Sequence, residues 1–158
     1  MPSSKFEPYT DNLSDLRRFI MSLDIHPVFA HFPQAFTFTV LVLSGLCLIL
    51  SGETRDFLLV TLKTLAVCLP FTVILTFAAG LFDGKIRLKR LHTPLLIKKI
   101  VIGGLFIAFS AGGAVLICAT PMTTPFMCGF AVLSFCSFLC SIALGLLGVK
   151  LLTTRLPG

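Results

Sequence analysis

Long apolar blocks, separated by short polar connections, fill most of this chain. The four blocks are Gln34–Ser51, Phe57–Phe82, Ile100–Cys118 and Phe126–Val149. Because a helix needs about 20 mostly apolar residues to cross a bilayer, each block can form one membrane span. The pattern therefore predicts an all-α integral membrane protein, a four-helix up-down bundle. The expected spans are about 34–51, 57–82, 94–118 and 126–149.

The stretch before the first block has a different pattern. Residues 1–11 are polar, and Asn12 is a typical helix N-cap. Apolar residues then recur at steps of three and four, at Leu13, Leu16, Ile20 and Leu23. This spacing predicts an amphipathic helix that lies on the membrane surface or against a partner. We therefore expect two regions, a tail with a surface helix over 1–24 and a transmembrane domain over 25–158.

Composition supports the membrane class and bears on partners. The chain has 158 residues, of which 56% are hydrophobic and only 13% charged, whereas about a quarter of the residues in a soluble domain are charged. The formal net charge is +6, and the cations flank the spans, where they indicate topology and contact with anionic lipids. No nucleic-acid motif is present. The expected partners are membrane lipids and other subunits of a membrane complex.

The positions of the cations predict the orientation. A dense cluster lies between the second and third apolar blocks, at Lys85, Arg87, Lys89, Arg90, Lys98 and Lys99. Positive residues mark cytoplasmic loops, and with four spans both termini then lie on the same side. The two opposite connections carry a single cation, Arg55. We therefore expect a multi-pass protein of the bacterial inner (cytoplasmic) membrane with both termini in the cytoplasm.

Small residues predict how the helices pack. Gly104, Ala108 and Gly112 recur at steps of four in the third span, as do Ser137, Ser141 and Gly145 in the fourth. Small residues at this spacing allow close helix contact in lipid. The six cysteines are also expected to be small core residues, because none forms a CxxC pair. Cys118 and Cys128 flank the third connection and would be able to pair in an oxidising compartment.

All three histidines are expected on the cytoplasmic side. His26 and His31 precede the first span and His92 precedes the third, and these two spans run in the same direction. Two helices that present imidazoles at one depth can ligate a haem iron from opposite sides. Being only five residues apart, His26 and His31 are not expected to be axial ligands of one haem together. We expect His31, paired with His92, to hold a haem b.

A haem also needs cations for its two propionates. Five basic residues lie close to His92 in sequence and are expected to supply them: Arg87, Lys89, Arg90, Lys98 and Lys99. Three alternatives stay open. The histidines could hydrogen-bond to headgroups, carbonyls or the carboxylates Asp24 and Asp83. They could form a three-histidine metal site, or one of them could donate to a quinone headgroup.

Short motifs carry a resemblance to a known family. They are His26-Pro27 with Phe32-Pro33, Gly80-Leu81-Phe82-Asp83, and His92 after the basic loop. Together they are similar to the pattern of a widespread bacterial family of small four-helix membrane proteins, classed as a domain of unknown function. The resemblance covers about residues 24–118. Because some members are joined to, or encoded with, small redox proteins, it implies electron transfer.

Two functions follow from these features. The first is a membrane subunit that binds a b-type haem near the cytoplasmic face and passes electrons between quinone and a protein partner. The alternative is a cofactor-free accessory subunit that anchors or stabilises a larger membrane complex. A transporter or channel is disfavoured because Lys63, near one edge, is the only charged residue within the four apolar blocks. A stand-alone enzyme is disfavoured because no catalytic motif appears.

Overall fold

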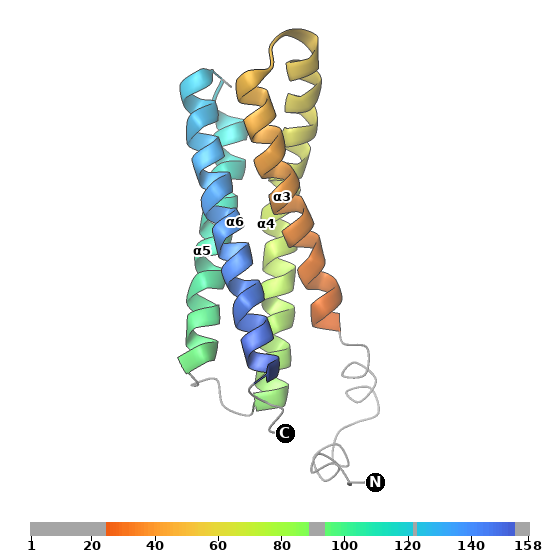
Figure 1. Cartoon of the computed structure of the whole chain (residues 1–158), viewed down its shortest axis with the longest axis vertical. Coiled ribbons are helices and arrows are strands. Elements are labelled where there is room, and N and C mark those ends of the chain that lie inside the picture. The colour runs from red at the N-terminus through yellow and green to blue at the C-terminus, as the bar shows by residue number, and fades with distance from the viewer. Residues whose placement is uncertain (1–24, 89–93, 122, 154–158) are drawn as a thin grey trace.

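The fold is an all-α four-helix bundle, as the sequence predicts (Figure 1). The computed structural model describes residues 25–88, 94–121 and 123–153, with side chains over 31–81, 94–121 and 123–148. Its helices are α3 (Ile25–Ile49), α4 (Gly52–Leu88), α5 (Pro94–Ala119) and α6 (Thr124–Thr153). The amphipathic helix expected within residues 1–24 lies outside the described residues.

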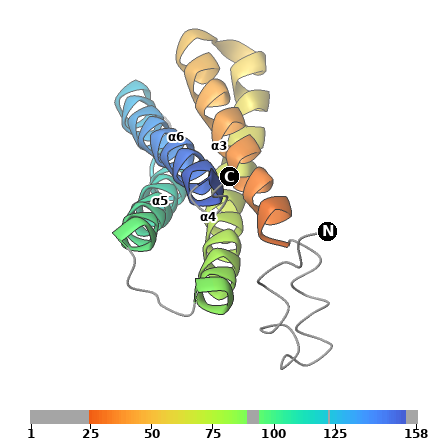
Figure 2. The same cartoon turned by 60° about the horizontal axis from the view of Figure 1, so that its bottom comes forward.

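The helices form a closed ring. Each packs mainly against its neighbours in the chain, and α6 closes the ring against α3. Figures 1 and 2 show the antiparallel arrangement, in which α3 and α5 stand diagonally opposite and run in the same direction. We call the end where α3 and α5 begin the basic end, because Lys98 and Lys99 lie there. The opposite end, with the connections at 50–51 and 120–123, is the turn end.

Length and polarity identify a multi-pass membrane protein. Every helix contains a stretch long and apolar enough to cross a bilayer, and these stretches are His31–Ile49, Gly52–Leu81, Pro94–Ala119 and Thr124–Gly148. At most 28% of the most apolar part of any span is buried inside the bundle. Large apolar side chains such as Phe71, Val115 and Leu146 are therefore exposed, and lipid contact explains their position.

The first connection is shorter than the sequence predicts. Residues 52–56 are expected to be a loop, whereas α4 already begins at Gly52, whose φ of 71° turns the chain out of α3. The polar residues of this segment form the first turn of α4, where Glu53 faces the favourable end of the helix dipole. The Arg55 Nε donates a 3.1 Å hydrogen bond to the Cys47 carbonyl oxygen, which ties this turn to the end of α3.

The interior face of α5 differs from the predicted one. Gly104 and Ala108 are exposed and Gly112 is half-buried, so the step of four does not mark the packing face. The buried residues of α5 instead follow one step of seven and then alternating steps of three and four, at Leu96, Gly103, Phe106, Ser110, Gly113 and Ile117. In α6, by contrast, Ser137 and Ser141 are buried as expected. Because an α-helix has 3.6 residues per turn, residues at alternating steps of three and four stay on one face. Residues at a strict step of four move progressively around the helix.

The α3–α4 hairpin projects beyond the α5–α6 hairpin at the turn end (Figure 1). Phe77 and Gly103 contact each other and therefore lie at one level. At 1.5 Å per residue, Phe77 lies about 37 Å from the start of α4, whereas Gly103 lies about 24 Å from the end of α5. The projection is therefore about 13 Å. Counted from the same contact, Lys63 and Ile117 are each 14 residues towards the turn end. Lys63 therefore lies at the height of Ile117, close to where α5 ends.

Candidate functional site

The basic end is where the sequence predicts a cofactor site. The two diagonal helices α3 and α5 both begin there (Figure 1), so the start of α3, which carries His26 and His31, lies at the same end of the bundle as the start of α5. His92 lies outside the described residues, as do Lys89 and Arg90. The side chains of His26 and Arg87 also lie outside them, although both positions belong to helices, α3 and α4 respectively.

The register of α3 separates the two predicted histidine positions. The interior face of this helix is formed by buried residues at steps of three and four, namely Pro33, Thr37, Val40, Ser44 and Cys47. Position 26 lies seven residues before Pro33, which is two turns along the same face. His31 lies two residues before Pro33, about 200° around the helix, and its side chain is exposed. The structure thus places His31 on the outer surface of α3.

The described cations line the start of α5. Lys98 is exposed, and Lys99 is half-buried. Both lie within the first two turns of α5, which begins at Pro94. They therefore stand at the mouth of the bundle, at the end where α3 also begins. Lys98 lies about 200° around α5 from the buried Leu96 and faces outward, whereas Lys99 lies beside the interior face.

Packing limits how far a large ligand could enter from the basic end. Leu69, Val73 and Phe106 form a buried cluster, against which Phe36 and Leu144 also pack. Nearer the basic end, the Phe77 ring fills the space beside Gly103. A cofactor held between α3 and α5 therefore has to lie on the basic side of this layer, towards residues 25–33 of α3.

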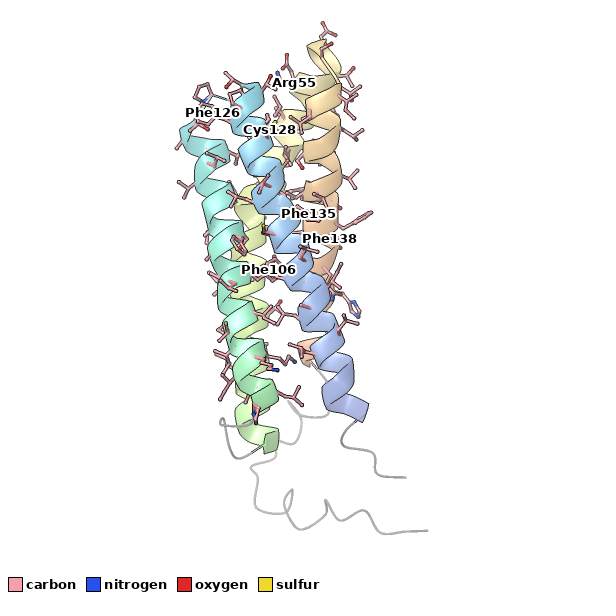
Figure 3. All side chains as sticks on the ribbon, turned by 60° about the vertical axis from the view of Figure 1, so that its left-hand side comes forward. Arg55, Phe106, Phe126, Cys128, Phe135 and Phe138 are labelled. Carbon is pink, nitrogen blue, oxygen red and sulfur yellow. The ribbon has the colours of Figure 1, made fainter. Side chains whose placement is uncertain are left out.

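Other predicted ligand sets can be checked only in part. Among the side chains that the structure describes, no three histidine, cysteine, aspartate or glutamate residues gather into a metal-binding group. The six cysteines are all free thiols. Cys118 and Cys128, the pair considered for a disulfide, are exposed, whereas Cys47 is buried. Figure 3 shows Cys128 at the turn end together with Arg55 and Phe126.

A polar interior site was not predicted from the sequence. Hydroxyl side chains from three helices line a small cavity between the spans, and these are Thr37, Ser110, Ser134 and Ser137. The sequence pattern predicts Ser137 as a packing residue alone and assigns no role to Ser134. The signal that would have revealed the site is the recurrence of hydroxyls at helical spacing within apolar spans, because each must find a hydrogen-bond partner away from water.

Comparisons with protein-family models, with curated proteins and with solved structures find no match to this chain. The resemblance described for residues 24–118 therefore stays a prediction.

Proposed function

We propose that this chain is a membrane redox subunit that binds a b-type haem at the basic end of its bundle and passes electrons between quinone and a protein partner. The observation that supports this most is the register of α3, in which position 26 is two helical turns before the buried Pro33 and in line with it, at the end of the bundle where α5 begins. In this proposal His26 replaces His31 as the ligand from α3, and His92 remains the opposing ligand. The basic end faces the cytoplasm.

The fit between the residues and the haem rests on donor chemistry and charge. Neutral imidazole is a common axial ligand of haem iron. Lys99 is a half-buried cation in the second turn of α5, about 60° around the helix from the buried Leu96, where it would pair with a haem propionate. Such a pair would hold the propionate edge of the haem towards the basic end. The haem supplies the one-electron chemistry when bound, while the chain positions it and tunes its potential.

His31 then takes a different role. Its imidazole is exposed on the outer face of α3, and it lies at the start of that helix's apolar stretch. A quinone that diffuses in the bilayer would approach this face directly. The imidazole N–H would donate a hydrogen bond to a quinone carbonyl oxygen, close to the proposed haem and still outside the bundle.

The experiment that tests this function is haem analysis of the purified protein. We expect a Soret band and close to one haem per chain after expression with added haem precursor. His92→Ala should lose most of the haem, whereas Gln34→Ala, which also changes a polar residue near the start of α3, should retain it. Apoprotein that is folded but takes up no haem under these conditions would contradict the proposal.

The alternative function, an accessory subunit of a larger membrane complex, has separate support from the turn end. The projecting α3–α4 hairpin exposes Ile49 (83%), Phe57 (73%) and Val60 (66%), beside the charged residues of the first turn of α4. If a bilayer of about 30 Å begins at Lys99, it ends close to Ala119, and this tip lies beyond it. Apolar side chains at such a tip are expected to pack against another protein, as in an accessory subunit of a membrane complex.

Matched substitutions on α4 can test the second function. Phe57 and Phe71 are similarly exposed, at 73% and 65%, but only Phe57 lies on the projecting tip. We expect Phe57→Ala to reduce copurification of a partner complex from native membranes, and Phe71→Ala to leave it unchanged. An equal effect of the two substitutions would argue against a docking tip.

A further inference from the structure

A small cavity lies in the interior of the bundle, away from both ends. Its volume is about 10 Å³, which is about the space that one water molecule requires. The cavity wall is partly apolar, with Val40, Leu69 and Phe130 among its residues. It is also lined by the hydroxyls of Thr37 from α3, Ser110 from α5, and Ser134 and Ser137 from α6.

Three of these hydroxyls are satisfied within their own helices. The Thr37 Oγ1 donates to the Pro33 carbonyl oxygen, and the Ser110 Oγ donates to that of Ile107 at 3.0 Å. The Ser134 Oγ donates to the Phe130 carbonyl oxygen at 2.9 Å. Each hydroxyl oxygen keeps lone pairs that can accept a further hydrogen bond.

Ser137 differs from its neighbours. Its side chain is 1% exposed and lines the cavity, yet within the part of the chain that the structure describes no hydrogen bond joins its hydroxyl to another residue. A buried hydroxyl without a partner is unfavourable, because burial removes its hydrogen bonds to water and nothing replaces them. A water molecule in the cavity would supply the missing partner of the Ser137 hydroxyl.

We propose that this cavity is a binding site for a single water molecule, held by Ser137 together with Thr37, Ser110 and Ser134. The Ser137 hydroxyl donates to the water oxygen, and the water donates its two hydrogens to the hydroxyl oxygens of two of the other three residues. This gives the water three hydrogen bonds, the number that is typical of buried water. The water and the surrounding hydroxyls thus form one hydrogen-bonded group between α3, α5 and α6 inside the apolar bundle.

Substitution of a glycine in the cavity wall tests the proposal, because a bound water decides whether the substitution lowers or raises stability. Gly113 lines the cavity, and a Cβ there would meet the Phe130 ring at 3.4 and 3.8 Å, an ordinary contact. Gly113→Ala therefore adds a methyl group that the packing tolerates. If the cavity holds water, the methyl group displaces it and leaves Ser137 without a partner. If the cavity is only a packing gap, the methyl group fills it and raises stability.

The control is Gly104→Ala on the same helix. Nothing lies within 4 Å of a Cβ at Gly104, so this variant reports the gain in helix propensity alone. We expect Gly113→Ala to have a Tm roughly 2–4 °C or more below that of Gly104→Ala, the shift that corresponds to losing about one buried hydrogen bond in a chain of this size. In a Ser137→Ala background, where no hydroxyl needs the water, this difference should disappear.

Two results would overturn the proposal. One is a Gly113→Ala protein at least as stable as Gly104→Ala in the wild-type background. The other is a loss of stability that is equal with and without Ser137, which indicates a steric clash. If the variants do not fold, a structure of the wild-type protein at about 2 Å decides the question. Density within hydrogen-bond distance of the Ser137 Oγ supports the water site, and its absence overturns it.

Discussion

The Phe77 ring occupies the space where a side chain on Gly103 would stand. A Cβ at Gly103 would come within 2.5 Å of both Cδ2 and Cε2 of that ring, closer than atoms in real structures approach. Gly103 is buried in α5 and Phe77 is half-buried in α4, so this contact joins two neighbouring spans near the basic end. It also fixes the relative level of the two hairpins, because the ring and the glycine belong to different ones.

Substitution of Gly103 should therefore destabilise the bundle. In Gly103→Ala the ring must move, and overpacking of this kind costs about 1–3 kcal/mol. Gly104→Ala, one residue along, has no atom within 4 Å of the new Cβ and should be neutral or slightly stabilising. Thermal unfolding in a mild detergent measures both. Equal Tm values for the two variants would contradict the contact.

Arg55 should stabilise the α3–α4 hairpin. Its Nε donates to the Cys47 carbonyl oxygen, one of the last carbonyls of α3, which lacks a complete set of partners within the helix. Arg55→Met keeps much of the apolar stem but removes the donor, and we expect it to cost about 1–2 kcal/mol. Arg55→Lys should recover little, because a lysine ammonium does not reproduce the guanidinium geometry. Denaturant titration of the three proteins tests this, and an unchanged midpoint in Arg55→Met would show that the bond contributes nothing.

The thiols should react according to their burial. Cys47 is buried and Cys118 is exposed, although both lie towards the turn end. In variants that retain one cysteine each, we expect a small maleimide to label Cys118 at least about tenfold faster than Cys47, since the thiol must be accessible to react. The rates are measured by mass spectrometry in detergent. Similar rates would indicate that the turn end opens in solution.

The orientation can be tested with reporters at the C-terminus. The cations around α5 predict that the basic end faces the cytoplasm, and α6 ends there. A fluorescent protein that matures only in the cytoplasm should therefore fluoresce when fused after residue 158, and a periplasmic phosphatase should stay inactive. Replacing Lys98 and Lys99 with glutamine should weaken this preference. An active phosphatase fusion on the wild-type chain would reverse the assignment.

The sequence predicts the helices better than it predicts their faces. Four apolar blocks of bilayer length are enough to give four spans, and the structure confirms the bundle. Apolar residues occur all around each span, however, because lipid and protein interior are both apolar. The interior face is therefore marked only by small and hydroxyl residues, which is why Gly104 was expected inside when Gly103 is buried instead.

The candidate site shows the same limitation. That both helix starts lie at one end follows from counting spans, and the structure confirms it. A choice between His31 and His26 requires the register of α3, which the sequence does not show. Once the interior positions from Pro33 to Cys47 are known, the face that carries each histidine position follows from 100° per residue.

The most direct measurement is a reduced-minus-oxidised spectrum of the purified protein and its histidine variants. We predict b-type bands in the wild-type protein and in His31→Ala, and their loss in His26→Ala and His92→Ala, with all four proteins retaining the helical content of the bundle. Bands that survive in His26→Ala but vanish in His31→Ala would contradict the interior ligand from α3. A folded wild-type protein that shows no bands after haem supplementation would contradict haem binding itself.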